Sequence, residues 1–458
     1  MSFAPLVLRW RLTPGASLAR SAITDLVLTN ADGTAVILTP GHAGLRDALL
    51  ALCDGADEKH LMQLVGAQRS AHLYYHLSGL VDCGALEANA VLDGTTVVRL
   101  VPRHLQFELP MVPELPQSVV LDRFAFLRRG ERGALLQHPE AACDLVLEGP
   151  AAIELVGHLA ARPIDVDAFG GTVERALVTL LLALGFVRDV GSAEEASRRS
   201  WEFHDRLFQR TTRFYRDLTP RGGTYRFLGA LPAPPAVRPA YAGRSITLPR
   251  LPAGGSAASR SLLDVMETRR SRRAMSETPV GLESVGEVLH RVARVTAVLP
   301  GSREVPQDAL LRPYPSGGAI HELEFYLAVR ACEGLEPGFY HYRGLQHALT
   351  QIAGAEAPAA AMLKDCGADW GQPDQPPQVL VVIASRLPRL AWKYAGIAYR
   401  ISLMNAGVAI QSLYLVTTDL DLAGSAQGPG NPELFAQATG VSSWEETSIA
   451  GFGFGRPA

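Results

Sequence analysis

The spacing of apolar residues predicts alternating helices and strands in the second half of the chain. Between residues 282 and 292, apolar side chains recur at the spacing typical of one helical face. Apolar runs predict buried strands at residues 323–330, 378–385 and 447–456, and residues 338–353 predict a hairpin. Residues 391–420 predict one long helix that begins around Leu390. Helices around a mixed sheet define an α+β domain.

The first half of the chain predicts a degenerate repeat. In the first copy, a strand pair with a turn at Asp32-Gly33 precedes short helices at residues 45–55, 60–66 and 70–80. In the second copy, strands at residues 123–130 and 133–139 precede helices at residues 151–160 and 173–187. Strands followed by short helices indicate two winged-helix-like modules, at residues 1–102 and 103–190.

The charge of residues 1–190 helps to distinguish nucleic-acid binding from peptide binding by such modules. Residues 1–190 carry 15 basic and 21 acidic side chains, and the last helix of each copy has almost no lysine or arginine. DNA binding needs cations that neutralise phosphates, so we expect no nucleic-acid partner. A winged-helix module can instead hold a peptide as an added strand at a sheet edge. A purely structural or dimerisation role is the alternative.

The remaining chain divides into a linker region and a third domain. Residues 191–258 predict a helix followed by a Pro/Gly-rich linker or extended arm, and residues 259–458 form the α+β domain. The five cysteines include no CxxC pair, so neither a disulfide framework nor a metal site is expected. No signal peptide or membrane span is expected either, which predicts a cytoplasmic protein.

Four arginines gather at the end of a predicted helix at residues 261–269. Arg269, Arg270, Arg272 and Arg273 surround Ser271, in the part of the chain that carries the basic excess. Forked guanidinium donors beside a hydroxyl suit a phosphate monoester. The alternative is a solvated helix end whose arginines complement the helix dipole.

Two loops contain glycines near polar residues. The segment at residues 312–319 has prolines that fix the backbone and paired glycines that allow close approach to a flat ligand. An ordinary turn is the alternative for this segment. Residues 425–431 form a second loop after the long helix, and the final strand places Arg456 near the terminus.

Several longer motifs follow one another in the C-terminal part of the chain. They are WEFHDRLF, RPYPSGGAIHELEFYL, GFYHYR, WKYAGIAYR and NAGVAIQSLYL. Their order, with the Arg-Arg-Ser-x-Arg segment, resembles the FMN-dependent nitroreductase fold over about residues 200–458. The closer resemblance is to peptide azoline dehydrogenases of the SagB type, which include the oxidases of cyanobactin and thiazole/oxazole-modified microcin pathways. Residues 1–190 resemble the tandem precursor-peptide recognition elements fused to cyanobactin oxidases.

The resemblance implies a role for each motif. Residues that would hold the FMN phosphate and ribityl chain are Arg269, Arg270, Ser271, Arg273 and, closing on the phosphate, Arg456. Residues that would lie along the isoalloxazine are Pro315, Ser316, Gly317, Gly318, Gln411 and Gly428. Lys393 and Tyr394 match the Lys-Tyr pair of the azoline dehydrogenases and would carry the acid–base step. Flavins of this fold sit at a homodimer interface, so a homodimer is implied.

Lysine is rare in this chain, which draws attention to Lys393. The chain has 43 lysines and arginines together, and the only lysines are Lys59, Lys364 and Lys393. A general base must lose its own proton near neutral pH, which a desolvated lysine can do and an arginine cannot. Either neutral Lys393 takes the proton, or its ammonium lowers the pKa of Tyr394 so that a phenolate takes it.

The expected function is therefore an FMN-dependent oxidation. Thiazolines or oxazolines in a ribosomally made precursor peptide would be dehydrogenated to thiazoles or oxazoles. One alternative is a nitroreductase or flavin reductase that uses NAD(P)H and acts on small molecules. The other is a non-catalytic scaffold that binds peptides.

Overall fold

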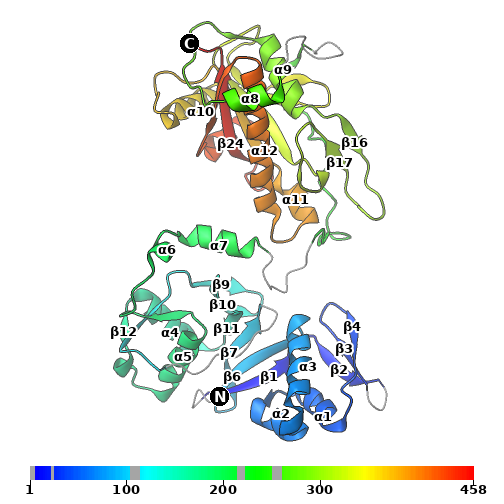
Figure 1. Ribbon diagram of the computed structural model, residues 1–458, viewed down its shortest axis with the longest axis vertical. Helices are drawn as coiled ribbons and strands as arrows, with labels where there is room; N and C mark the ends of the chain where they lie inside the picture. Colours follow the sequence, from blue (N-terminus) through cyan, green and yellow to red (C-terminus); the bar gives the residue numbers. More distant parts are fainter. Residues whose placement is uncertain (1–5, 22–24, 104–113, 214–221, 250–259) are drawn as a thin grey trace. The chain divides into compact units, whose positions relative to one another are not determined.

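The computed structural model describes residues 6–21, 25–103, 114–213, 222–249 and 260–458 (Figure 1). Its internal contacts divide the chain into two compact units, Met1–Thr219 and Pro220–Ala458. Each unit has its own sheets and its own hydrophobic core.

A seven-stranded sheet forms the centre of the second unit, with the strand order β14-β21-β20-β18-β22-β24-β23. The strands are β14 (Ser245–Thr247), β18 (Leu323–Val329), β20 (Gly338–Arg343), β21 (Ala348–Gln351), β22 (Val379–Ser385), β23 (Ala423–Gln427) and β24 (Thr447–Gly455). Every residue of β18 and β22 is buried, which explains why nearly all of them are apolar, with Glu324 and Ser385 as the exceptions. The predicted strands and hairpin are present, but this sheet is antiparallel throughout rather than mixed.

Helices cover both faces of this sheet. They are α8 (Leu262–Thr268), α9 (Leu282–Ala293), α10 (Glu356–Asp369), α11 (Leu387–Lys393), α12 (Ala398–Asp419) and α13 (Pro432–Thr439). Phe325 and Leu327 of β18 share a core with α9 and α12, whereas Tyr326 and Ala328 share one with α10 and α13. This alternation follows from the strand geometry and gives the α+β architecture. Two short strand pairs complete the unit: β15 (Val280–Gly281) with β19 (Cys332–Glu333), and β16 (Ala297–Leu299) with β17 (Ala309–Leu311).

The predicted long helix is in fact two helices. The first of them, α11, ends at Lys393, and Tyr394 is its C-terminal cap. Tyr394 is extended, with a ψ of 128°, Gly396 then adopts a positive φ of 74°, and α12 begins at Ala398. The placement of Lys393 in the first turn of one long helix was therefore wrong. By length and composition α12 could cross a membrane, but it contributes Ala406, Ala409 and Leu413 to the core.

The Pro/Gly-rich segment before β14 lies as an arm against α11. Arg389, which is completely buried, donates to the carbonyl oxygen of Pro234 over 2.7 Å. The indole of Trp392 donates to the carbonyl of Leu231 over 3.0 Å. The described part of the arm, residues 222–249, therefore belongs to the second unit.

The first unit contains two copies of a similar order of elements, and the first copy has one more helix and one more strand than the second. The first copy comprises β1 (Val7–Leu12), β2 (Ser17–Arg20), β3 (Leu26–Thr29), β4 (Ala35–Leu38), α1 (Ala43–Ala51), β5 (Ala56–Asp57), α2 (Glu58–Val65), α3 (Ser70–Asp82), β6 (Leu86–Leu92) and β7 (Thr95–Pro102). The second comprises β8 (Ser118–Leu121), β9 (Phe126–Gly130), β10 (Gly133–Gln137), β11 (Cys143–Leu147), α4 (Pro150–Ala161), β12 (Ile164–Asp165), α5 (Thr172–Ala183) and β13 (Val187–Asp189). In the first copy β1 lies between β5 and β6, and in the second β8 lies between β12 and β13.

The two copies are joined through one sheet. Strand β7 of the first copy pairs with β11 of the second, which gives the order β5-β1-β6-β7-β11-β10-β9. The first copy's strands β2, β3 and β4 form a separate sheet, in which β4 is an edge strand.

The helix predicted within residues 191–219 is also interrupted. Two short helices are present, α6 (Ala196–Arg199) and α7 (Phe203–Thr211). Glu202 between them is extended, with a ψ of 158°, so one continuous helix was wrong. Residues 214–219 lie outside the described part of the chain.

Candidate functional site

The turn at residues 315–318 is fixed by a buried polar network. Asn405 of α12 accepts a hydrogen bond from the backbone N–H of Gly317, and its amide nitrogen donates to Ser316 Oγ over 3.0 Å. The same nitrogen donates to both carboxylate oxygens of Glu322, at 3.2 and 3.0 Å. Burial raises the pKa of Glu322, which is fully inaccessible to solvent. The network therefore couples the turn to the core of the unit.

Lys393 and Tyr394 meet this turn at Gly318. The Lys393 amino group donates to the Gly318 carbonyl oxygen over 3.4 Å. A Cβ atom at Gly318 would lie 2.8 Å from Lys393 Nζ and would collide with Tyr394 Oη. Gly318 also has a φ of 63°, so both its conformation and its neighbours require glycine. The structure thus brings the predicted Lys-Tyr pair to the predicted glycine turn.

The surroundings of the pair shift both pKa values. Burial lowers the pKa of Lys393 below its usual value of 10.5, because a charged amine is less well solvated there. Burial raises the pKa of Tyr394, and the nearby Tyr225 adds to this effect. A neutral amine and a protonated phenol are therefore both favoured relative to the free side chains.

The arginine segment lies beside a different part of α12. The guanidinium of Arg269 is 5.2 Å from the ring centroid of Tyr414, and Ser271 Oγ lies 3.0 Å from Tyr414 Oη. The backbone N–H of Ala426 donates to the same hydroxyl over 2.9 Å. Burial raises the pKa of Tyr414, but hydrogen bonds from Ala426, Ser271 and Ser425 and the charge of Arg269 outweigh it and lower the pKa.

The backbone joins this segment to the C-terminus and to strand β23, which contains residues 425–427, so the predicted loop at residues 425–431 was wrong for its first three residues. Arg272 N–H donates to the carbonyl of Gly424 in β23, and Ser276 N–H donates to the carbonyl of Arg456. Arg272 itself pairs with Asp421 over 3.0 Å. Among the described residues, no carboxylate lies within the 4.0 Å ion-pair distance of the other predicted arginines: Arg269, Arg270, Arg273 and Arg456. Arg269 is half-buried and the other three are exposed, although Arg270 also donates to the carbonyls of Glu267 and Arg269. Without a carboxylate partner, these guanidinium groups could pair with an anion such as a phosphate monoester.

The other predicted ligand residues are less constrained. Pro315 and Gly428 are exposed, and nothing lies within 4 Å of a Cβ placed at Gly428. Gln411 is exposed on α12. A single chain therefore leaves one side of the site open to solvent.

Two positions on α12 organise the site but were not predicted. Asn405 holds the turn and Tyr414 holds the arginine segment, about 13 Å apart along the helix at a rise of about 1.5 Å per residue. Asn405 is 95% buried, and it stands in an apolar helical stretch where a buried amide needs partners. An asparagine within an apolar helical stretch was therefore the feature of the sequence that could have indicated the network. Glu322 and Glu324 give the same signal within the apolar segment around β18.

Replacing Asn405 by alanine is expected to destabilise the fold by about 1–3 kcal/mol, because Glu322 and Gly317 lose a buried partner. The free energy of unfolding measured with denaturant tests this. Ser412→Ala, on the same helix but outside the network, serves as the control. Equal stability of the two variants would contradict the role given to Asn405.

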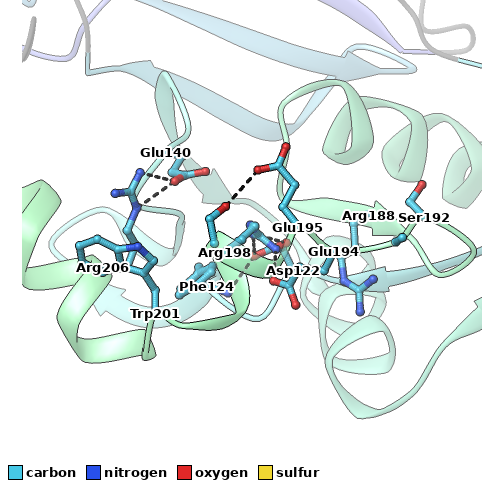
Figure 2. A pocket seen from close by; sticks show the side chains of 12 residues that line it. Asp122, Phe124, Glu140, Arg188, Ser192, Glu194, Glu195, Arg198, Trp201 and Arg206 are labelled. Atoms are coloured by element: carbon cyan, nitrogen blue, oxygen red, sulfur yellow. Dashed lines mark hydrogen bonds and ion pairs between the residues drawn. The ribbon is translucent and has the colours of Figure 1, made fainter.

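A separate hollow of about 520 Å³ lies in the first unit (Figure 2). Its charged side chains pair with one another. Asp122 binds Arg198 at 2.7 Å and the imidazole of His138 at 3.1 Å, and Arg206 pairs with Glu140. These contacts hold α6 and α7 against the second repeat. They explain why the boundary between the two units falls after α7.

Comparison with known proteins finds family matches in two segments of the chain. Residues 266–456 match the family model for the nitroreductase family, and residues 119–217 match the model for the cyanobactin oxidase ThcOx. A putative nitroreductase of Methanocaldococcus jannaschii is 28% identical over 164 residues, which cover 35% of this chain and 75% of that protein.

Two solved structures resemble the chain more distantly. A putative nitroreductase from Ralstonia eutropha is 21% identical in sequence, with a TM-score of 0.37. The match covers 50% of this chain and 96% of the Ralstonia chain. The second structure is the Escherichia coli microcin synthetase McbBCD complex with truncated pro-MccB17 bound. One chain of it is 19% identical in sequence, with a TM-score of 0.34, and the match covers 52% of this chain and 88% of that chain.

The family match relates residues 266–456 of the second unit by sequence to an oxidoreductase family, the class predicted from the motifs. Members of this family bind FMN, which confirms the predicted cofactor at the level of the family. The residues present suit FMN. Ser271 and arginines that have no carboxylate partner could bind a phosphate group.

Proposed function

We propose that this protein is an FMN-dependent azoline dehydrogenase that acts on a ribosomally made precursor peptide. It would convert thiazolines or oxazolines to thiazoles or oxazoles. The observation that carries the proposal is the meeting of Lys393 and Tyr394 at Gly318. A reductase of small molecules has no evident need for an amine and a phenol beside that turn.

The protein would supply binding and proton transfer. Arg269, Arg270, Ser271, Arg273 and Arg456 would hold the phosphate end of FMN, and Pro315 to Gly318 would face its ring system, with Gln411 and Gly428 nearby. When bound, FMN provides the two-electron acceptor for the dehydrogenation. Lys393 would take the proton from the ring carbon, since burial favours its neutral amine. Tyr394, kept protonated, would donate a hydrogen bond to the substrate.

The first unit would recruit the peptide. Its second repeat and α6–α7 fall within the segment that matches the cyanobactin oxidase model. We take the two repeats, at residues 1–102 and 103–190, as winged-helix-like recognition modules. Edge strand β4 offers unpaired backbone groups, and Ile37 on it is 68% exposed, so an extended peptide could add there as a further strand.

Deleting residues 1–219 is expected to leave the flavin bound while weakening action on full-length precursor. The reason is that this unit would contribute affinity for the peptide but no catalytic group. KM and kcat for full-length precursor and for a short azoline peptide would be compared. An unchanged KM for both substrates would contradict recruitment and favour a structural role.

The C-terminal unit would act as a homodimer. Exposed apolar side chains form a stripe on α12 and on α8, which packs against it: Tyr399, Leu403, Met404 and Val408 on α12, and Leu262, Leu263 and Met266 on α8. A stripe of this kind is typical of a protein–protein interface. Gln411 lies on the same exposed face, seven positions after Met404. A partner subunit there would close the open side of the cofactor site.

Met404→Glu is expected to give monomeric protein with little flavin, because a charge would be buried at the interface. Light scattering reports the oligomeric state, and absorbance reports the flavin content. Trp444→Glu adds the same charge at a residue that is 89% exposed outside this stripe, and it should change neither property. A wild-type protein that is monomeric with full flavin would exclude the dimer.

Anaerobic addition of an azoline peptide tests the reaction class. The proposed dehydrogenase would lose its yellow flavin absorbance on mixing with the azoline peptide, without NAD(P)H. The similarity to a putative nitroreductase favours one other candidate, an NAD(P)H-dependent reductase of small molecules. That enzyme would be bleached by NAD(P)H and not by the peptide. A colourless protein without flavin would instead favour a peptide-binding scaffold.

A further inference from the structure

The arm that precedes β14 reaches the Lys393–Tyr394 pair. The backbone N–H groups of Thr224 and Tyr225 both donate to the carbonyl oxygen of Lys393, at 2.8 and 3.2 Å. Tyr225 has a φ of 47°, a strained conformation for a residue with a bulky side chain. The surrounding contacts therefore hold this residue in place.

The ring of Tyr225 lies beside the amino group of Lys393. Lys393 Nζ is 5.9 Å from the centroid of Tyr225 and 5.4 Å from that of Tyr394. Trp392 supports the Tyr225 ring edge-on, with the centroids 5.7 Å apart. A Cβ atom at Gly223 would lie 3.3 Å from Lys393 Cε and 3.2 Å from the Tyr225 ring. The arm thus packs directly against the lysine side chain.

Few other polar groups face this amine among the described residues. They are the two phenols and the Gly318 carbonyl, and no described residue forms an ion pair with Lys393. Arg389, one turn earlier on α11, donates instead to the carbonyls of Pro234, Asp308 and Ile320. Exclusion of water, rather than a charged neighbour, is therefore what lowers the pKa of Lys393.

We propose that Tyr225 is a positioning residue of the site, whose ring shields the Lys393 amino group from water and so keeps the lysine able to act as a base. The aromatic ring carries this role and the hydroxyl group does not. The consequence for catalysis rests on the proposed function of Lys393. The shielding itself can be measured without any turnover.

The scarcity of lysine makes a direct measurement possible. Trace acetylation of the purified, flavin-loaded full chain at a series of pH values gives the midpoint at which each amine becomes reactive. Peptide mass spectrometry separates Lys393 from the exposed Lys59 and Lys364, which serve as internal references. The wild-type midpoint of Lys393 should lie below those of both references.

Tyr225→Ala should raise the Lys393 midpoint by about half a pH unit or more, because a hydrated amine holds its proton more tightly. Tyr225→Leu, which retains part of the apolar cover, should give a smaller rise, and Tyr225→Phe should match wild type. Phe227→Ala is the matched control on the same arm. The Phe227 ring contacts Arg226 rather than Lys393, so its removal should leave the Lys393 midpoint unchanged. In turnover assays, the acidic limb of the kcat/KM profile should move with the labelling midpoint while KM changes less than kcat.

Two results would overturn the inference. An unchanged or lower Lys393 midpoint in Tyr225→Ala would mean that the ring does not shield the amine. A Tyr225→Phe variant that behaves like Tyr225→Ala would assign the effect to the hydroxyl. If the midpoints move as expected but azoline peptides are not oxidised by any variant, Tyr225 shields Lys393 and the proposed function is what fails.

Discussion

Lys393→Ala is expected to retain FMN and to lose azole formation by about 100- to 10,000-fold, the usual contribution of a general base. The amine lies against Gly318 and away from the arginine segment at Tyr414, so its removal should not release the phosphate end of the cofactor. Flavin absorbance per chain and the rate of azole formation would be measured on the same preparation.

Two further substitutions at this pair separate the possible roles. Lys393→Arg keeps the positive charge but cannot lose a proton near neutral pH, so it should be as inactive as Lys393→Ala. Tyr394→Phe should reduce turnover less, because a phenol with a raised pKa donates a hydrogen bond rather than taking the proton. In the wild type, kcat/KM should rise with pH until Lys393 is neutral, with a midpoint below its usual value of 10.5. Full activity of Lys393→Arg would exclude Lys393 as the base and return that role to Tyr394.

Arg269→Ala and Arg273→Ala are each expected to give flavin-poor protein. A charge-assisted hydrogen bond to a phosphate contributes about 1.5–3 kcal/mol, so the loss of one guanidinium should weaken FMN binding by at least tenfold. Equilibrium titration of protein stripped of flavin with FMN would measure the change in Kd.

Arg272→Ala is the matched control for these variants. Arg272 lies within the same segment, but its guanidinium already pairs with the exposed Asp421, and its backbone contact to Gly424 does not need the side chain. We expect this variant to bind FMN as the wild type does. If all three variants bind alike, the phosphate lies elsewhere and the segment is only a solvated helix end.

The strands and most helices of the second unit could be predicted because burial on both faces of a strand gives runs that are almost entirely apolar. Strands β18 and β22 are examples, and α9 has its apolar positions on one face. The meeting of Lys393 with Gly318 could not be predicted from spacing, since 75 positions separate the two residues. Only the resemblance to a known family connected them.

Three features of the structure could not be predicted from the local sequence pattern. The break between α11 and α12 includes the extended Tyr394 and the positive φ of Gly396, whereas helical periodicity continues across it in the sequence. The two short helices α6 and α7 are fixed by contacts of Arg198 and Arg206 with the second repeat, which no local pattern reveals. Asn405 was overlooked because a single amide in an apolar helix acquires meaning only when its partners are known.

Mass spectrometry of an azoline peptide incubated with the flavin-loaded protein tests the central claim most directly. The account predicts a loss of about 2 Da, two hydrogen atoms, for each ring oxidised to an azole. The same peptide should keep its mass when it is incubated with Lys393→Ala of equal flavin content. An unchanged peptide mass with the fully flavin-loaded wild type, tested on both thiazoline and oxazoline peptides, would contradict the account.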